Sequence, residues 1–115
     1  MKMYIKGNWV DKSETIPVLN PFDQSVLDTV PRGTASDVDL AIGSAVRGAQ
    51  VMAKMPAYER YTILRRAADL MAERADDLAE TITKEEGKVI AEGRAEVQRA
   101  IQTITLSAEE SKRLH

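Results

Sequence analysis

The sequence predicts a short β region followed by a longer helical region. Up to residue 33, short apolar runs alternate with Gly, Pro and Asn turns. From residue 34 onward, apolar residues recur every three or four positions, which is the period of an amphipathic helix. The length of 115 residues fits one domain. Because three short strands form a small sheet, we expect some helix faces to need a partner outside this stretch.

Three strands are expected in the β region. They lie at residues 3–10 around a turn at Lys6-Gly7-Asn8, at residues 15–19, and at residues 25–30. Gly beside Asn supplies the positive φ of a tight hairpin turn. Pro17 cannot donate a hydrogen bond to a sheet, so the run that contains it suits an edge strand.

Three or four amphipathic helices are expected after residue 33. Thr34 followed by Asp37 resembles a capping box, and Pro56 suits the start of the next helix. The apolar stripe restarts around Asp76-Asp77, which predicts a break there. Gly87 is expected to cap a helix at its carboxyl end, and the last helix starts at about Val89.

Composition excludes several function classes. Hydrophobic residues make up 43% and charged residues 30%, with a net charge of −2, so no basic surface for nucleic acid is expected. No run reaches the ~20 apolar residues of a membrane span, and the first residues lack a signal sequence. We therefore expect a cytoplasmic protein that binds no membrane.

The inventory of reactive side chains is small. The chain has no cysteine, which excludes a thiolate nucleophile or zinc site within it, and its single histidine, His115, is the last residue. We expect no catalytic role and no metal role for that histidine. The residue counts alone do not exclude a catalytic lysine base or a catalytic pair of carboxylates.

Several segments share a pattern with one known family. They are Tyr4-Ile5-Lys6-Gly7-Asn8-Trp9-Val10, Val18-Leu19-Asn20-Pro21-Phe22-Asp23, Val30-Pro31, residues 35–39, Met55-Pro56-Ala57-Tyr58-Glu59-Arg60, residues 63–70 and Glu85-Glu86-Gly87-Lys88. In this order and spacing, they resemble the amino terminus of the NAD(P)-dependent aldehyde dehydrogenase superfamily. The resemblance covers the whole chain.

The resemblance implies an α/β parent enzyme that oxidises an aldehyde to a carboxylic acid. In that family a cysteine thiolate attacks the carbonyl, hydride passes to NAD or NADP, and a glutamate-activated water releases the acid. All of these motifs lie beyond residue 115 in the family, so no catalytic or cofactor-binding residue is expected here, and the segment alone should be inactive.

The resemblance also implies a domain organisation. Residues 1–33 and 34–115 would be two parts of one incomplete domain, the second being the helical part of the cofactor-binding domain. The implied partners are the rest of the chain and a small aldehyde, and the parent would be a homodimer or homotetramer.

Arg99 is the one candidate substrate-binding residue. The stretch from Ala95 to Glu110 resembles a branch that includes non-phosphorylating glyceraldehyde-3-phosphate, lactaldehyde and phosphonoacetaldehyde dehydrogenases. In the first of these, an arginine at the matching helix position contacts the substrate phosphate, and a guanidinium suits phosphate or carboxylate oxygens. The alternative interpretation of Arg99 is a solvated helix residue paired with Glu96.

Two other functions remain open from the sequence. The chain could be a stand-alone helical interaction or assembly module from a truncated gene. A small isomerase or hydrolase that uses Lys or Asp/Glu is a third possibility, which no motif supports.

Overall fold

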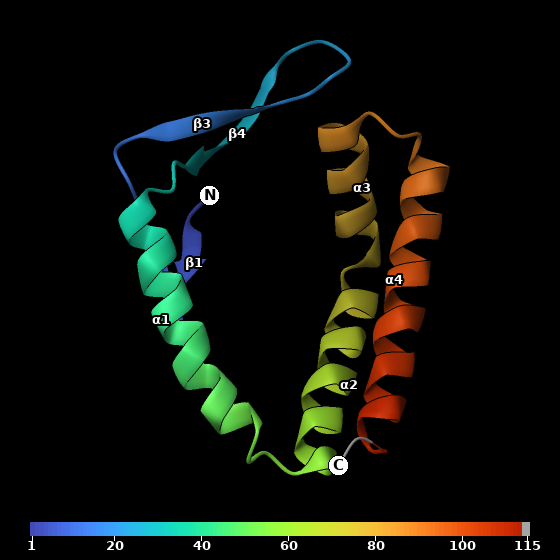
Figure 1. Cartoon of the computed structure of the whole chain (residues 1–115). Coiled ribbons are helices and arrows are strands. Elements are labelled where there is room, and N and C mark those ends of the chain that lie inside the picture. Colours follow the sequence, from blue (N-terminus) through green and yellow to red (C-terminus); the bar gives the residue numbers. More distant parts are fainter. Residues whose placement is uncertain (114–115) are drawn as a thin grey trace. The chain divides into compact units, whose positions relative to one another are not determined.

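The computed structural model describes residues 1–113, and His115 therefore lies outside the described residues. Within residues 1–113, four strands are followed by four helices (Figure 1), which confirms the β-then-α order. The contacts group the chain into two compact units, one of residues 1–54 and one that begins at Met55. The first helix thus belongs with the strands. That residues 1–33 and 34–115 are parts of one domain stays a prediction.

The first hairpin pairs β1 (Met3–Ile5) with β2 (Asn8–Val10) in antiparallel register. Its two turn residues, Lys6 and Gly7, have φ values of 54° and 80°. Positive φ at both central positions is typical of a type I′ turn, whose twist matches that of the strands. The sequence analysis assigned positive φ to Gly beside Asn. Asn8 instead begins β2, and its Nδ2 donates a hydrogen bond to the Lys6 carbonyl at 3.1 Å.

The second hairpin is a separate sheet. Strand β3 (Thr15–Leu19) pairs antiparallel with β4 (Val26–Pro31), and a register shift falls between Val18 and Leu19. Both strands of a two-stranded sheet are edges, so Pro17 lies on an edge strand as expected. The hairpin expected within residues 3–10 is present, and because it consists of two strands, the structure has four strands where the sequence analysis counted three.

Helix α1 (Ala35–Met52) starts at the expected capping box and leaves its apolar stripe in solvent. The Thr34 side chain accepts a hydrogen bond from the Asp37 amide, and the Asp37 side chain accepts one from the Thr34 amide. Within its unit, α1 contacts β1. Ile42 and Val46 are 57% and 59% exposed, and Val38 and Met52 on the same helix are also exposed. These apolar side chains gain little from burial within the described chain.

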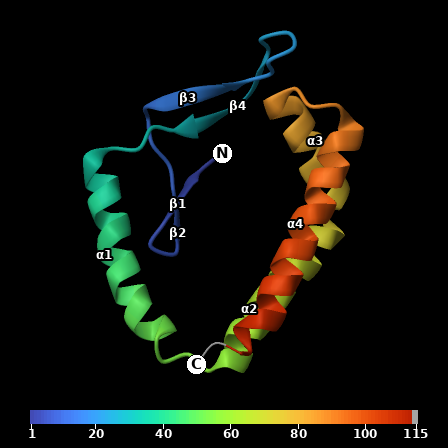
Figure 2. The same ribbon diagram turned by 45° about the vertical axis from the view of Figure 1, so that its right-hand side comes forward.

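The second unit is built around the last helix. Helix α4 (Ile90–Ser111) runs alongside both α2 (Ala57–Glu73) and α3 (Ala75–Glu86), as Figure 1 and Figure 2 both show. Pro56 precedes α2, and Gly87 ends α3 with a left-handed φ of 76°, as expected. The break between α2 and α3 falls at Arg74, two residues before the expected Asp76.

The core of this unit consists mainly of small side chains. Its buried apolar residues are Ala68, Ala79, Val97 and Ala108, and within residues 1–113 no large side chain is fully buried. Alanines at helix contacts let the backbones approach closely, but each buries little apolar area. The helices are therefore packed tightly without the hydrophobic burial of a complete domain core.

Gly93 lies where α3 and α4 are in close contact. A Cβ added at this position would lie 2.9 Å from the Ala79 carbonyl oxygen and 3.3 Å from Thr83 Oγ1. The Ala79 atom belongs to a helix backbone, so it cannot rotate away. The sequence suggests only that Gly93 weakens the helix, whereas the structure shows that it lets two helices touch.

We predict that Gly93→Ala destabilises the chain by about 1–3 kcal/mol, because the added methyl forces α3 and α4 apart. Alanine is otherwise the better helix former by up to ~1 kcal/mol, so the steric term must exceed that gain. Urea denaturation followed by circular dichroism measures the change.

Gly48→Ala is the matched control. Gly48 also lies inside a helix, but an added Cβ there meets no atom within 4 Å, so this variant should be as stable as the wild type or more stable. Equal stabilisation by both substitutions would show that the contact at Gly93 has no energetic weight.

Candidate functional site

Arg99 lies in the middle of α4 with its side chain exposed. It lines an open hollow of about 410 Å³ together with Glu96, Ala100, Thr103 and Ile104. A second hollow is formed by Arg99 and the preceding part of α4, namely Glu92, Ala95 and Glu96. Arg99 and Glu96 thus border both hollows, and the guanidinium is the cationic group that they share.

Lys88 forms an ion pair with Glu96, the residue that borders both hollows together with Arg99. Lys88 stands in the short connection between α3 and α4, and its Nζ lies 2.5 Å from Glu96 Oε2 and 2.8 Å from Glu86 Oε2. Hydrogen bonds to Glu86 and then to Glu96 raise the pKa of Lys88 well above its ordinary value. The hydrogen bond from Lys88 in turn lowers the pKa of Glu96. Lys88 and Glu96 are therefore both charged at neutral pH.

The Glu96 carboxylate is directed to Lys88 and does not form the expected pair with Arg99. Within residues 1–113, the Arg99 guanidinium makes neither a hydrogen bond nor an ion pair, and its charge is only a minor cause of the lowered pKa of Glu96. Arg99 therefore offers its donors to the solvent-filled hollows. A guanidinium in this state suits a phosphate, sulfonate or carboxylate group. That Arg99 binds substrate stays a prediction.

An apolar hollow adjoins this charged group. It has a volume of about 190 Å³ and lies among α2, α3 and α4, lined by Met71, Leu78, Thr81, Ile82, Glu96, Val97 and Ala100. Glu96 and Ala100 border both this hollow and the one that Arg99 lines. The surface of α4 thus changes from apolar to charged across these two residues.

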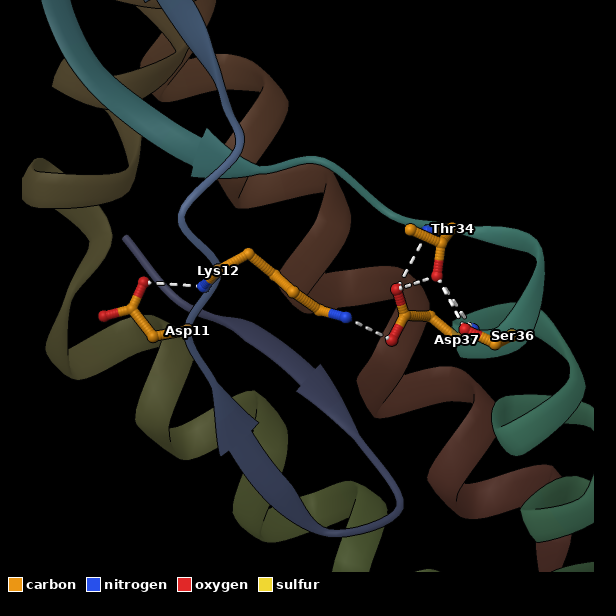
Figure 3. A network of polar contacts seen from close by, with 5 residues as sticks. All are labelled: Asp11, Lys12, Thr34, Ser36 and Asp37. Atoms are coloured by element: carbon orange, nitrogen blue, oxygen red, sulfur yellow. Dashed lines mark hydrogen bonds and ion pairs between the residues drawn. The ribbon is translucent and has the colours of Figure 1, made fainter.

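The remaining well-connected polar cluster is structural. Lys12 Nζ lies 2.8 Å from Asp37 Oδ1, while Asp37 Oδ2 accepts hydrogen bonds from the Thr34 amide at 2.8 Å and the Thr34 hydroxyl at 2.7 Å (Figure 3). Asp37 is 7% exposed. Both carboxylate oxygens are occupied by groups that hold the start of α1. The cluster therefore ties α1 to the segment after the first hairpin and offers no free acid or base.

The structure gives no support to a lysine base. A catalytic lysine needs a lowered pKa, whereas carboxylate partners raise the pKa of Lys88 and of Lys112. Within the described chain, no three His, Cys, Asp or Glu side chains are grouped so that they could hold a metal ion. Among helices in residues 1–113, none has the length and hydropathy needed to span a membrane.

The sequence analysis did not single out Lys88 or Gly93. Lys88 was named only as the last residue of the segment Glu85-Glu86-Gly87-Lys88, which contributes to the family resemblance. Its contact with Glu96 crosses a helix boundary and spans eight residues, so a search for helical neighbours three or four apart does not find it.

Comparison with known proteins gives matches along nearly the whole chain. A sequence model of the aldehyde dehydrogenase family matches residues 9–115. The chain is 41% identical over 113 residues to 3-sulfolactaldehyde dehydrogenase of Priestia aryabhattai, a match that covers 98% of this chain and 23% of that protein.

Solved structures share the backbone. Aldehyde dehydrogenase 21 from Physcomitrella patens, in complex with the reaction product succinate, matches with a TM-score of 0.96 and 36% identity over 99% of this chain and 24% of that one. A variant of betaine aldehyde dehydrogenase from Staphylococcus aureus, in complex with NAD⁺, matches with a TM-score of 0.93 and 28% identity over 98% of this chain and 24% of that one. The chain thus spans about a quarter of the length of these relatives.

We predict that the stability of the chain falls as the pH drops from about 4 towards 2. Hydrogen bonds from Lys12 and then from Thr34 lower the pKa of Asp37 from 3.8 to about 2. Because the folded-state pKa is the lower one, the stabilisation is complete above pH 3.8 and is lost on acidification through pH 2. Denaturation midpoints measured from pH 2 to pH 6 test this.

Asp37→Asn should weaken this pH dependence without abolishing it, because the amide cannot titrate, whereas Glu96, whose pKa is also lowered, still can. Asp39→Asn removes an exposed carboxylate of the same helix and should keep the wild-type dependence. Identical pH dependence in the wild type and Asp37→Asn would contradict the assignment of the acid transition to Asp37.

Proposed function

The chain belongs to the aldehyde dehydrogenase family, and on this premise we propose that it forms the amino-terminal part of an oxidoreductase that converts an aldehyde to a carboxylic acid with NAD or NADP. The observation that carries the proposal is the match of the family model to residues 9–115 together with a shared backbone over 99% of the chain. The chemistry would reside in the part of the family fold that these residues do not match.

The connection before α4 does not fit the phosphates of the cofactor. It is one of the places where a glycine lies just before a helix start, as in many phosphate sites. There, however, the carboxylates of Glu86 and Glu96 occupy Lys88, and Glu92 lies in the first turn of α4. Three negative charges around one helix start oppose a pyrophosphate. Cofactor binding is therefore assigned to the rest of the enzyme, and no catalytic residue is assigned here.

The exposed face of α1 supports a partner within the same enzyme. Val38, Ile42, Val46 and Met52 lie in solvent along this helix, although apolar side chains of this size are usually covered. Three quarters of the length of the related dehydrogenases lies outside the matched region. We assign that remaining polypeptide as the partner that covers α1, in a cytoplasmic enzyme assembled as a homodimer or homotetramer.

Arg99 favours an aldehyde that carries an anionic group. Anionic compounds are named for the two more similar relatives: one is named for 3-sulfolactaldehyde, which carries a sulfonate, and the other is in complex with its reaction product succinate, a dicarboxylate. The relative named for cationic betaine aldehyde is only 28% identical. Lactaldehyde, after which one member of the narrower branch expected from the sequence is named, is neutral, whereas glyceraldehyde-3-phosphate and phosphonoacetaldehyde, after which two others are named, are anionic. With an anionic aldehyde, Arg99 would bind the anionic group and position the aldehyde carbonyl for reaction elsewhere in the enzyme.

We predict that aldehyde-dependent reduction of NAD or NADP requires more than this stretch. The 115-residue chain and the longest polypeptide that its gene encodes are assayed side by side with anionic and neutral aldehydes. Activity in the longer polypeptide alone is the expected result. Turnover by the 115-residue chain would contradict the assignment of the catalytic residues. Activity in neither would favour a stand-alone interaction module.

We further predict that Arg99→Ala in the active polypeptide raises the KM for an anionic aldehyde by about 10- to 100-fold, since a hydrogen bond to a charged group contributes roughly 1.5–3 kcal/mol. The KM for a neutral aldehyde is measured in parallel.

Arg94→Ala is the matched control for this substitution. Arg94 is another exposed arginine of α4, and it pairs with Asp76 at 3.2 Å. Its removal should leave both KM values close to those of the wild type, because exposed pairs contribute little. If Arg99→Ala behaves like Arg94→Ala, substrate binding by Arg99 is ruled out.

A further inference from the structure

We infer that Lys88 is a positioning residue for substrate selection, because it holds the Glu96 carboxylate and thereby keeps the Arg99 guanidinium free for the anionic group of the aldehyde. This inference rests on the proposed role of Arg99.

Glu96 is the natural competitor for Arg99. Residues three apart on a helix are neighbours, and opposite charges at this spacing attract each other. Glu96 and Arg99 have this spacing and border the same two hollows. An ion pair between them would neutralise the guanidinium and occupy donors that an anionic substrate needs.

In the structure, the Glu96 carboxylate forms its ion pair with Lys88. Lys88 Nζ lies 2.5 Å from Glu96 Oε2, and both side chains are 37% exposed. The comparable pair of Lys84 and Glu80 on α3 is 56% and 62% exposed. Because the Lys88–Glu96 pair is less exposed, solvent and salt screen it less than they screen an ordinary surface pair.

The backbone fixes Lys88 in a position to do this. Gly87 ends α3 in the left-handed conformation and Val89 precedes α4, so Lys88 lies in a connection of very few residues. The contact at Gly93 fixes the distance between the two helices. Glu86 also binds Lys88 at 2.8 Å and raises its pKa, which keeps the ammonium charged. Lys88 therefore remains a cationic partner for Glu96 across the neutral pH range.

The test compares KM values for an anionic and a neutral aldehyde in the longest polypeptide that the gene encodes. Lys88→Met should raise the ratio of the anionic KM to the neutral KM by about two- to five-fold, the range expected for one competing surface ion pair. Adding Glu96→Gln to Lys88→Met should restore the wild-type ratio, because the competitor is gone. Lys88→Arg should keep the wild-type ratio.

Lys84→Met serves as the matched control, since it removes an exposed lysine that pairs with a glutamate of the same unit. It should leave the ratio unchanged. If Lys88→Met does not fold, Lys88→Gln takes its place, because glutamine is polar and uncharged and its side chain is only one atom shorter than that of lysine.

The outcomes separate this inference from the function on which it rests. If Arg99→Ala leaves the ratio unchanged, the proposed role of Arg99 fails. If Arg99→Ala raises the ratio but Lys88→Met does not, or if Glu96→Gln fails to restore it, the inference about Lys88 is overturned while the role of Arg99 stands. In the Arg99→Ala background, Lys88→Met should have no further effect on the ratio. An additional effect there would show that Lys88 acts by another route.

Discussion

The second unit depends on the close contact of α4 with α2 and α3. Small residues make this contact possible, since Ala79 is fully buried and Gly93 lies against its carbonyl oxygen. The same contact fixes where the α3–α4 connection can run, and hence where the Lys88 side chain begins. Because of this position, the Glu96 carboxylate pairs with Lys88 and not with Arg99. Backbone packing and the charge pattern around Arg99 are thus linked through one helix contact.

Local sequence signals predicted most of the helix boundaries. Thr34 and Asp37 form the expected capping box, Pro56 precedes α2, and Gly87 adopts the positive φ that ends α3. Each of these signals depends on a few neighbouring residues, so they can be read without the fold. The break at Arg74 was placed two residues late because apolar spacing tells where a stripe restarts and not where the chain bends.

The features that the sequence did not predict depend on contacts between elements. The sequence shows that a glycine inside a helix lowers the helix propensity. Only the packed structure shows that the Ala79 carbonyl lies opposite Gly93. Likewise, Glu96 has a helical neighbour in Arg99, whereas its actual partner, Lys88, comes from the connection before the helix. The resemblance supplied Arg99 as a candidate, and the structure added the hollows and the free guanidinium.

The exposed stripe of α1 has a consequence for hydrogen exchange. Helices open locally with a free energy set by their buried contacts, so different helices of one chain exchange their amide protons at different rates. Helix α4 has two packing partners and a row of buried positions, whereas α1 contacts β1 and keeps Ile42 and Val46 in solvent. The amides of α1 should therefore exchange early when this stretch stands alone and become protected once its apolar face is covered. Protection along α1 would then report directly on assembly with the rest of the enzyme.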